Sequence, residues 1–151
     1  MKKKIGRTKN GFEVYVITNN EHMEAHADVT DDIIVEAIRK VVYRPPFWMN
    51  ALDMGRIIGK DKCVEITDSD DTKWVCRPGR SVESHMVYNK KPIDTTLITV
   101  GMCTDDVDGL VTIFTAHYGV KAPKEPTDSH LRECEREESE KFWNTHALCA
   151  E

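Results

Sequence analysis

Residues 95–102 (TTLITVGM) and residues 110–118 (LVTIFTAHY) decide the fold of this 151-residue chain. Both segments are rich in β-branched side chains, which pack well on the pleated surface of a sheet. The residues between them end in Asp108 and Gly109, a dipeptide that is typical of a tight hairpin turn. The two segments therefore predict an antiparallel β-hairpin.

Upstream of this hairpin, the sequence predicts one strand and two short helical segments. Residues 12–18 (FEVYVIT) alternate aromatic and β-branched side chains, as a strand does. Residues 30–42 repeat apolar side chains at helical spacing after Thr30, a good N-cap, and Pro45-Pro46 ends the run. The apolar residues 47–55 are expected to form a second short helix or a turn that packs on the first.

Two further elements complete the expected fold. Residues 63–67 (CVEIT) and 72–76 (TKWVC) flank a cluster of Asp and Ser, which predicts a first hairpin. After a proline-marked loop, Asp128 or Ser129 can cap a charged terminal helix. The predicted fold class is α+β, a single domain over residues 1–151 in which N-terminal helices pack on a central antiparallel sheet of hairpins, with a C-terminal helix.

Composition and charge limit the class of protein. Hydrophobic residues make up 40% and charged residues 31% of the chain, as in an ordinary globular protein. The apolar runs are far shorter than the ~20 residues that a membrane-spanning helix needs, so no membrane partner is expected. The net charge of -5 argues against binding nucleic acid by overall charge, although lysines and arginines gather locally.

The chain has five cysteines, and none of them forms the C-x-x-C spacing of a zinc or redox site. Reduced thiols in a cytoplasmic protein explain this pattern best. Cys63 and Cys76 flank the first predicted hairpin, so a disulfide between them is the alternative.

Known metal and cofactor motifs are missing or incomplete. In the calcium-like residues 104–109 (TDDVDG), loop positions one and twelve would be Thr104 and Thr115 instead of acidic ligands, so a hairpin turn is favoured. His22 and His26 have zinc-protease spacing, but the Glu between them stands one place too late. P-loop, dinucleotide-binding and serine-hydrolase motifs are also missing, so we expect no metal and no cofactor.

Polar side chains on the main hairpin form one candidate site. Alternation along the second strand puts Ile113, Thr115 and His117 on one face. Thr95 and Thr99 on the first strand face the same side in one of the two possible registers, and the other register separates the two groups. The sequence leaves both registers open.

A second candidate group lies just before the hairpin, where Arg77, Arg80 and His85 occur within nine residues. A histidine can transfer a proton near neutral pH, and arginine or lysine can bind a phosphate, so phosphodiester cleavage without a metal is within their chemistry. Lys90 and Lys91 add positive charge nearby. The alternative is that the arginines are solvated loop residues, the threonines are β-formers, and the histidines are surface or core groups.

The second half of the chain carries six short motifs: R-P-G-R at residues 77–80, S-x-x-V at 84–87, a threonine-rich strand at 95–100, F-T-A-x-x-G at 114–119, A-P-K-E-P-T-D at 122–128 and F-W-x-x-H-A-L at 142–148. With them it resembles a family of small uncharacterised bacterial and phage-type proteins, in which the fourth and fifth motifs read I-T-A-x-x-G and A-P-x-P-x-D. The expected pattern of helices, a central antiparallel sheet and scattered His, Arg and Thr is also similar to the barnase, EndoU, colicin and RelE-like ribonuclease fold.

The second resemblance implies roles for the candidate residues. His85 or His117 would act as general base or acid. Arg77 or Arg80 would bind the phosphate, and Thr99 or Thr115 would donate hydrogen bonds. Lys90 and Lys91 are further candidates for binding the substrate.

These residues support two functional hypotheses. The first is a metal-independent ribonuclease-like domain of a toxin, phage or mobile-element system, with RNA as substrate and an immunity or antitoxin protein as partner. The alternative is a non-enzymatic interaction protein that uses the acidic terminal helix, with Phe142 and Trp143, to contact a partner or a second copy. The oligomeric state is open.

Overall fold

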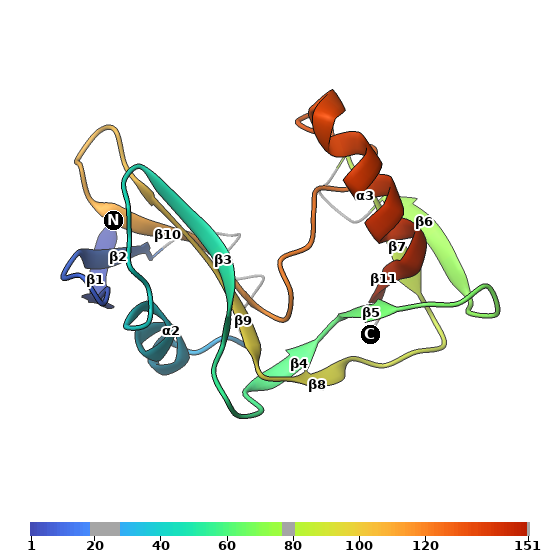
Figure 1. Ribbon diagram of the computed structural model, residues 1–151, viewed down its shortest axis with the longest axis horizontal. Helices are drawn as coiled ribbons and strands as arrows, with labels where there is room; N and C mark the ends of the chain where they lie inside the picture. Colours follow the sequence, from blue (N-terminus) through green and yellow to red (C-terminus); the bar gives the residue numbers. More distant parts are fainter. Residues whose placement is uncertain (19–27, 77–80, 151) are drawn as a thin grey trace. The chain divides into compact units, whose positions relative to one another are not determined.

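Figure 1 shows the chain in a computed structural model, which describes residues 1–18, 28–76 and 81–150. Strand accounts for 42% and helix for 15%, and the described residues contain two helices and several sheets. The predicted α+β architecture, with N-terminal helices packed on a central sheet, was therefore wrong, because the chain is β-rich. None of the described helices is long and apolar enough to cross a bilayer.

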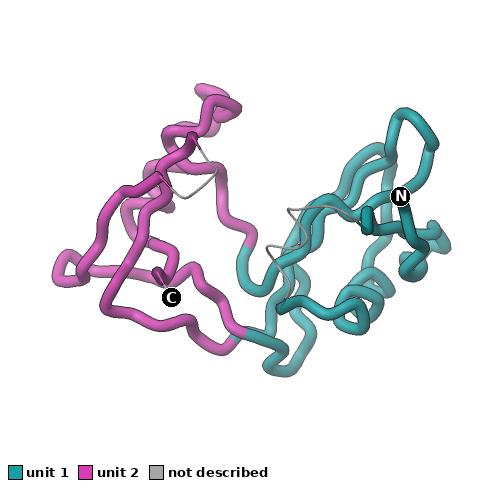
Figure 2. Tube along the Cα trace, turned by 180° about the vertical axis from the view of Figure 1, so that it is seen from behind, with its two compact units in different colours: residues 1–59, 95–120 teal, residues 60–94, 121–151 magenta. Residues whose placement is uncertain are grey.

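The chain forms two compact units, each built from two separate stretches of sequence (Figure 2). Unit 1 comprises Met1–Gly59 and Thr95–Val120, and unit 2 comprises Lys60–Asp94 and Lys121–Glu151. The single domain over residues 1–151 stays a prediction. Where the chain passes from one unit to the other it forms two short paired strands, β4 (Gly59–Asp61) and β8 (Ile93–Thr95).

Unit 1 is built on a five-stranded sheet with the order β1-β2-β10-β9-β3. Its strands are β1 (Lys2–Arg7), β2 (Glu13–Ile17), β10 (Val111–Tyr118), β9 (Leu97–Thr104) and β3 (Phe47–Asp53). Neighbouring strands are antiparallel except for β2 and β10, which run parallel. The pairing of β9 with β10 confirms the main hairpin, and β2 confirms the predicted first strand.

Strand β3 occupies the segment that was expected to be a helix or a turn, so that prediction was wrong. Phe47 pairs with Cys103 and Asp53 with Leu97, with every residue between them in register. Trp48 and Leu52 pack against the core of unit 1. A short apolar run has no periodicity that separates helix from strand, so the neighbouring strand β9 decides its conformation.

Helix α2 (Asp31–Ile38) begins at the expected N-cap. The Oγ1 of Thr30 accepts a hydrogen bond from the backbone N–H of Ile33 at 3.4 Å. The helix ends at Ile38, before the predicted end near residue 42. Its buried side chains join those of the sheet in one core cluster, which includes Val14, Ile34, Ala37, Ile38, Val41, Ile98, Val100, Met102 and Ile113.

Unit 2 contains a four-stranded sheet with the order β5-β11-β7-β6. Its strands are β5 (Cys63–Glu65), β11 (His146–Cys149), β7 (Glu83–Val87) and β6 (Thr72–Cys76). The predicted hairpin between residues 63–67 and 72–76 was wrong, because β5 and β6 lie at opposite edges with two strands between them. Cys63 and Cys76 are free thiols, so the alternative disulfide does not form either.

Helix α3 (Glu133–Thr145) is the expected terminal helix, and it leads directly into β11. Its N-cap is Arg132, whose backbone N–H donates to Glu135 Oε1 at 3.1 Å, and not Asp128 or Ser129. The buried indole of Trp143 donates to the carbonyl oxygen of Pro123 at 3.1 Å. Together with the small core of Val64, Val87, Ala147 and Cys149, this contact holds unit 2 together.

We expect Gly101→Ala to destabilise unit 1. A Cβ at this position would lie 2.5 Å from Phe114 Cζ and 2.8 Å from Thr115 Cγ2. Overpacking of this kind destabilises a fold by about 1–3 kcal/mol. This exceeds the stabilisation of roughly 0.5–1 kcal/mol that is gained when alanine replaces a glycine inside a strand. Thermal unfolding should show a lower Tm for Gly101→Ala, whereas Val107→Ala, at a side chain that is 95% exposed, should leave the Tm unchanged. An unchanged Tm for Gly101→Ala would contradict this packing.

Candidate functional site

The residues proposed from the sequence are distributed over both units. Thr99, Thr115 and His117 lie in unit 1. His85, Lys90 and Lys91 lie in unit 2. The remaining candidates fall outside the described residues: Arg77 and Arg80 of the R-P-G-R motif, and His22 and His26 of the zinc-like pair.

The hairpin register of unit 1 brings three of the polar residues onto one face. His117 lies directly opposite Thr99, and Thr115 lies opposite Gly101. Thr99 is fully buried, and its Oγ1 donates to the carbonyl oxygen of Gly119 at 2.8 Å. Thr95 belongs to β8 instead, where its Oγ1 accepts a hydrogen bond from a neighbouring backbone N–H.

One part of the predicted polar face was wrong, because β10 contains a register shift between Ile113 and Thr115. The extra residue, Phe114, reverses the alternation of the strand, as a β-bulge does. Ile113 consequently packs in the core together with Ala116, on the face opposite to His117. A prediction that assumes strict alternation along the strand does not include such a bulge.

His85 has a structural role in unit 2. Its side chain is buried, and Nδ1 lies 2.6 Å from the carbonyl oxygen of Trp143 and 3.0 Å from that of His146. Carbonyl oxygens only accept hydrogen bonds, so Nδ1 carries the proton and donates. The residue therefore joins β7 to the end of α3 and the start of β11.

The two lysines proposed as phosphate ligands differ in their surroundings. Lys90 donates from Nζ to the carbonyl oxygen of Glu65 at 3.0 Å and lies 3.5 Å from Asp70 Oδ2. Lys91 is exposed. Lys90 thus already contacts the end of β5 and the turn at Asp70, and of the two lysines Lys91 is the exposed one.

Unit 2 also contains a shallow surface cavity of about 250 Å³, largely open to solvent, that sequence reasoning missed. The residues that line it come from three segments that are distant in sequence: Trp74, Glu83, Pro126, Thr127, Glu140 and Asn144. Residues 72–76 were interpreted only as a strand, and the terminal helix as an acidic helix that contacts a partner through Phe142 and Trp143. Their approach to one another is a tertiary contact, for which the sequence contains no local indication.

The aromatic wall of this cavity is Trp74, which is 39% exposed. Trp74 lies opposite His85 in the pairing of β6 with β7, and the two rings stack at 4.5 Å with an interplanar angle of 4°. Because His85 is itself held by two carbonyl oxygens, the indole rests on a fixed support. The orientation of the aromatic wall is therefore built into the sheet.

Short hydrogen bonds position the loop that completes the cavity. The Oγ of Ser139 on α3 donates to the carbonyl oxygen of Lys124 at 2.6 Å. The backbone N–H of Glu83 donates to Thr127 Oγ1 at 2.9 Å. Glu140 and Asn144 are one helical turn apart and so lie on the same side of α3. Sheet, loop and helix are thus tied together around the cavity.

Two of the residues that line the cavity, Glu83 and Glu140, are acidic, and their carboxylates make few contacts with the described residues. The carboxylate of Glu83 makes no hydrogen bond or ion pair with any described residue, and Glu140 reaches only Arg136, at 3.9 Å. The indole N–H of Trp74 likewise donates to no group in the described part of the chain. Two carboxylates beside an aromatic face attract a cation by charge and by the ring quadrupole.

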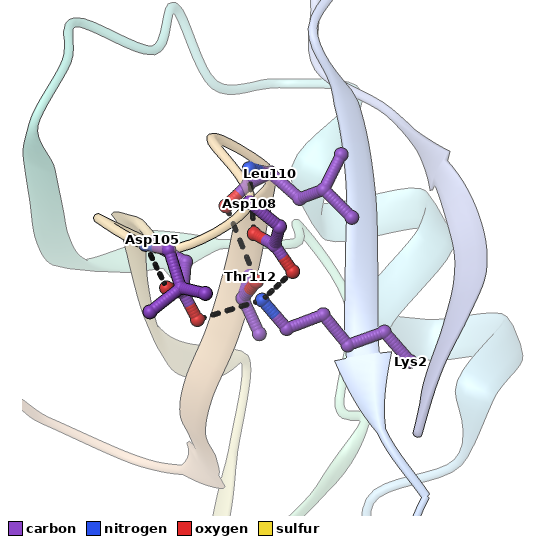
Figure 3. Close-up of polar contacts among 6 residues, drawn as sticks. Lys2, Asp105, Asp108, Leu110 and Thr112 are labelled. Atoms are coloured by element: carbon purple, nitrogen blue, oxygen red, sulfur yellow. Dashed lines mark hydrogen bonds and ion pairs between the residues drawn. The ribbon is translucent and has the colours of Figure 1, made fainter.

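The calcium-like loop is a hairpin turn in which a lysine is bound where a metal was considered (Figure 3). Nζ of Lys2 lies 2.8 Å from both Asp105 Oδ2 and Asp108 Oδ2. The second oxygens of the two carboxylates accept hydrogen bonds from the backbone N–H groups of Val107 and Leu110. The described residues contain no group of three or more His, Cys, Asp or Glu suited to a metal.

Cys63 is unsuited to nucleophilic catalysis. Burial, assisted by the nearby Asp61 and Cys149, raises the pKa of its thiol to about 12. At neutral pH the side chain is therefore a thiol and not the reactive thiolate. A cysteine-hydrolase mechanism gains no support from this residue.

The cluster around Lys2 should make stability depend on pH. Hydrogen bonds from Lys2, with help from backbone N–H groups, lower the pKa of Asp105 and of Asp108. A lowered folded-state pKa stabilises the fold above the unfolded value of about 3.9, and this stabilisation is lost as the pH falls through the folded values. Lys2→Met should therefore lower the Tm near neutral pH, and its difference from wild type should shrink below about pH 4.

Lys9→Met is the matched control for this measurement, because the side chain of Lys9 is exposed and forms no ion pair with the described residues. Its Tm should follow that of wild type at every pH. A Tm difference for Lys2→Met that stays constant through the acid range would contradict the ion-pair explanation.

Alkylation with iodoacetamide should separate the five cysteines in the folded protein. Cys76 and Cys134 are exposed and should be modified first. Cys63, with its raised pKa, should react more slowly than either, and peptide mass spectrometry would give the order. Unfolding in urea should remove the burial and increase the rate for Cys63. Equal rates for Cys63 and Cys134 in the folded state, with no increase for Cys63 in urea, would refute the protected thiol.

No family model matches the chain, and no curated protein or solved structure matches it. The resemblance to a bacterial and phage-type family and to the ribonuclease fold therefore stays a prediction. The evidence for function comes from the geometry of the two units.

Proposed function

We propose that this chain is a protein-binding module that takes a lysine or arginine side chain of a partner protein into the cavity of unit 2. The observation that supports this most directly is the indole of Trp74, stacked on His85 and lining the same cavity as Glu83 and Glu140. A cation placed against the indole would have one aromatic contact and two carboxylates around it. This arrangement favours an ammonium or guanidinium group over a neutral or anionic one.

The size of the cavity favours one side chain over a larger ligand. Sites for drug-sized molecules are typically about 300–1,000 Å³, and this cavity is about 250 Å³. A cation–π contact contributes roughly 0.5–1 kcal/mol at an exposed site and about 2 kcal/mol when it is desolvated. A single side chain in the cavity would therefore bind weakly, and tight binding would need contacts outside it.

This proposal keeps the interaction hypothesis but moves the contact surface. Trp143 is 3% exposed, and Phe142 stacks on His146 with ring centroids 4.1 Å apart. These aromatic side chains are used inside unit 2, so we place the partner contact on the side of α3 that carries Glu140 and Asn144.

The ribonuclease hypothesis has a smaller basis among the described residues. Nδ1 of His85 already donates to two carbonyl oxygens, and the other described histidine of the set, His117, belongs to the other unit. A cavity lined by Glu83 and Glu140 repels a phosphate. The ribonuclease activity, the RNA substrate, the antitoxin partner and the toxin, phage or mobile-element context stay predictions. The cytoplasmic location also stays a proposal, supported by five free cysteines.

An NMR titration tests the proposal with two small probes, Nα-acetyl-lysine methylamide and its uncharged norleucine analogue. We expect the lysine probe to shift the indole N–H signal of Trp74, and the norleucine probe to bind at least about tenfold more weakly, a difference of about 1.4 kcal/mol. The double variant Glu83→Gln and Glu140→Gln should lose the same preference. Equal binding of both probes to wild type would refute cation recognition.

The matched control is the double variant Glu137→Gln and Glu138→Gln, since both side chains are exposed on α3 and neither lines the cavity. It changes the net charge by the same amount and should keep the lysine preference. An RNA oligonucleotide should leave the Trp74 signal unchanged. A shift caused by RNA, with none caused by the lysine probe, would favour the ribonuclease hypothesis instead.

A further inference from the structure

Strand β6 is an outer strand of the unit 2 sheet, with β7 as its single neighbour. Their pairing runs from Thr72 opposite Val87 to Cys76 opposite Glu83 without a register shift. In the described part of the chain, no strand pairs with the other side of β6. The outer side of β6 is therefore an open edge.

The alternation of an antiparallel ladder shows which backbone groups face outward. Tyr88 donates from its backbone N–H to the carbonyl oxygen of Asp71 at 2.9 Å, so Asp71 forms a hydrogen-bonded pair across the two strands. Hydrogen-bonded and non-hydrogen-bonded pairs alternate along such a ladder. The N–H and C=O groups of Thr72, Trp74 and Cys76 consequently point away from β7, and no described residue bonds to them.

This edge carries fewer of the features that usually prevent strand addition than the edge strand of unit 1 does. The edge strand β1 of unit 1 carries Lys2, Lys3, Lys4 and Arg7 and a register shift between Lys4 and Gly6. Charged side chains and bulges of this kind discourage the pairing of an edge with another chain. Strand β6 has regular pairing, no proline and Lys73 as its one charged residue. It is therefore a regular template for another strand.

Trp74 connects the open edge with the cavity. Its backbone N–H and C=O belong to the edge, and its side chain lines the cavity. An added strand would lie about 4.8 Å from β6, with its side chains alternating between the two faces in step with those of β6. A residue opposite Trp74 would therefore direct its side chain over the same face as the indole.

We infer that the partner segment binds in an extended conformation as an additional strand on the outer edge of β6, with a lysine or arginine opposite Trp74 whose side chain enters the cavity. This inference rests on the proposed function and adds the conformation and the sequence pattern of the partner. The strand supplies the contacts outside the cavity that a single basic side chain lacks. Main-chain hydrogen bonds give affinity, and the cavity selects the side chain.

A second copy of this chain would not satisfy the same site. In an antiparallel pairing of two β6 strands centred on Trp74, each indole would face the other indole. Lys73 is the basic residue of β6, and alternation places its side chain on the face opposite to Trp74. The cavity would then receive no cation from β6 of a second copy, so we take the occupant to be a basic extended segment of a different protein.

The test uses a synthetic peptide of alternating Thr and Val with a central Lys, together with two backbone-methylated forms. In an added strand, alternate N–H groups face β6 and the others face solvent. Methylation of the set facing β6 should weaken binding at least tenfold, and methylation of the other set should leave it unchanged. Binding should also protect the backbone N–H of Trp74 from hydrogen exchange.

The outcomes of this test and of the proposed function are distinguishable. If both methylated peptides bind as well as the parent, strand addition is wrong, while a lysine preference lost in Glu83→Gln and Glu140→Gln would still support the cavity. If neither the peptide nor Nα-acetyl-lysine methylamide binds, both proposals fail.

Thr72→Pro provides an independent measurement, because its outward N–H is not needed in the ladder to β7. It should weaken peptide binding and leave the acetyl-lysine probe unaffected, whereas Thr72→Ala should bind the peptide like wild type. A wild-type dimer in solution that Thr72→Pro dissociates would overturn the inference by assigning this edge to a second copy. If Thr72→Pro proves unstable, the methylated peptides still decide the matter.

Discussion

The 2.6 Å hydrogen bond from Nδ1 of His85 to the carbonyl oxygen of Trp143 is the contact on which the candidate site depends. It joins the central strand β7 to the end of α3, where the chain turns into β11. The same imidazole supports the indole of Trp74 by stacking. One buried histidine therefore holds the helix close to the sheet and orients the aromatic wall of the cavity.

This arrangement places part of the negative charge of the chain at the candidate site. The net charge of -5 is uninformative as a sum, but two of the acidic side chains, Glu83 and Glu140, line the same cavity. Elsewhere, carboxylates are used for stability, as in the contacts of Lys2 with Asp105 and Asp108. Acidic residues already paired with lysine stabilise the fold, whereas the carboxylate of Glu83, which pairs with no described residue, is available for the proposed partner.

The errors of prediction share one physical cause. Residues 47–55 carry apolar side chains that suit either a helix or a strand, and pairing with β9 makes them a strand. Residues 63–67 and 72–76 are both β-formers close in sequence, but β11 and β7 lie between β5 and β6. In each case pairing with a strand from a distant part of the chain decided the structure, and the local sequence did not.

The sequence by itself determined the elements that depend on local interactions. Thr30 caps α2, and the β-branched runs around Asp108 and Gly109 form the β9–β10 hairpin, because caps and tight turns involve residues a few positions apart. Only the tertiary structure decided the bulge at Phe114, the partners of His85 and the cavity beside Trp74. These features join segments tens of residues apart, and their geometry depends on packing that no local pattern encodes.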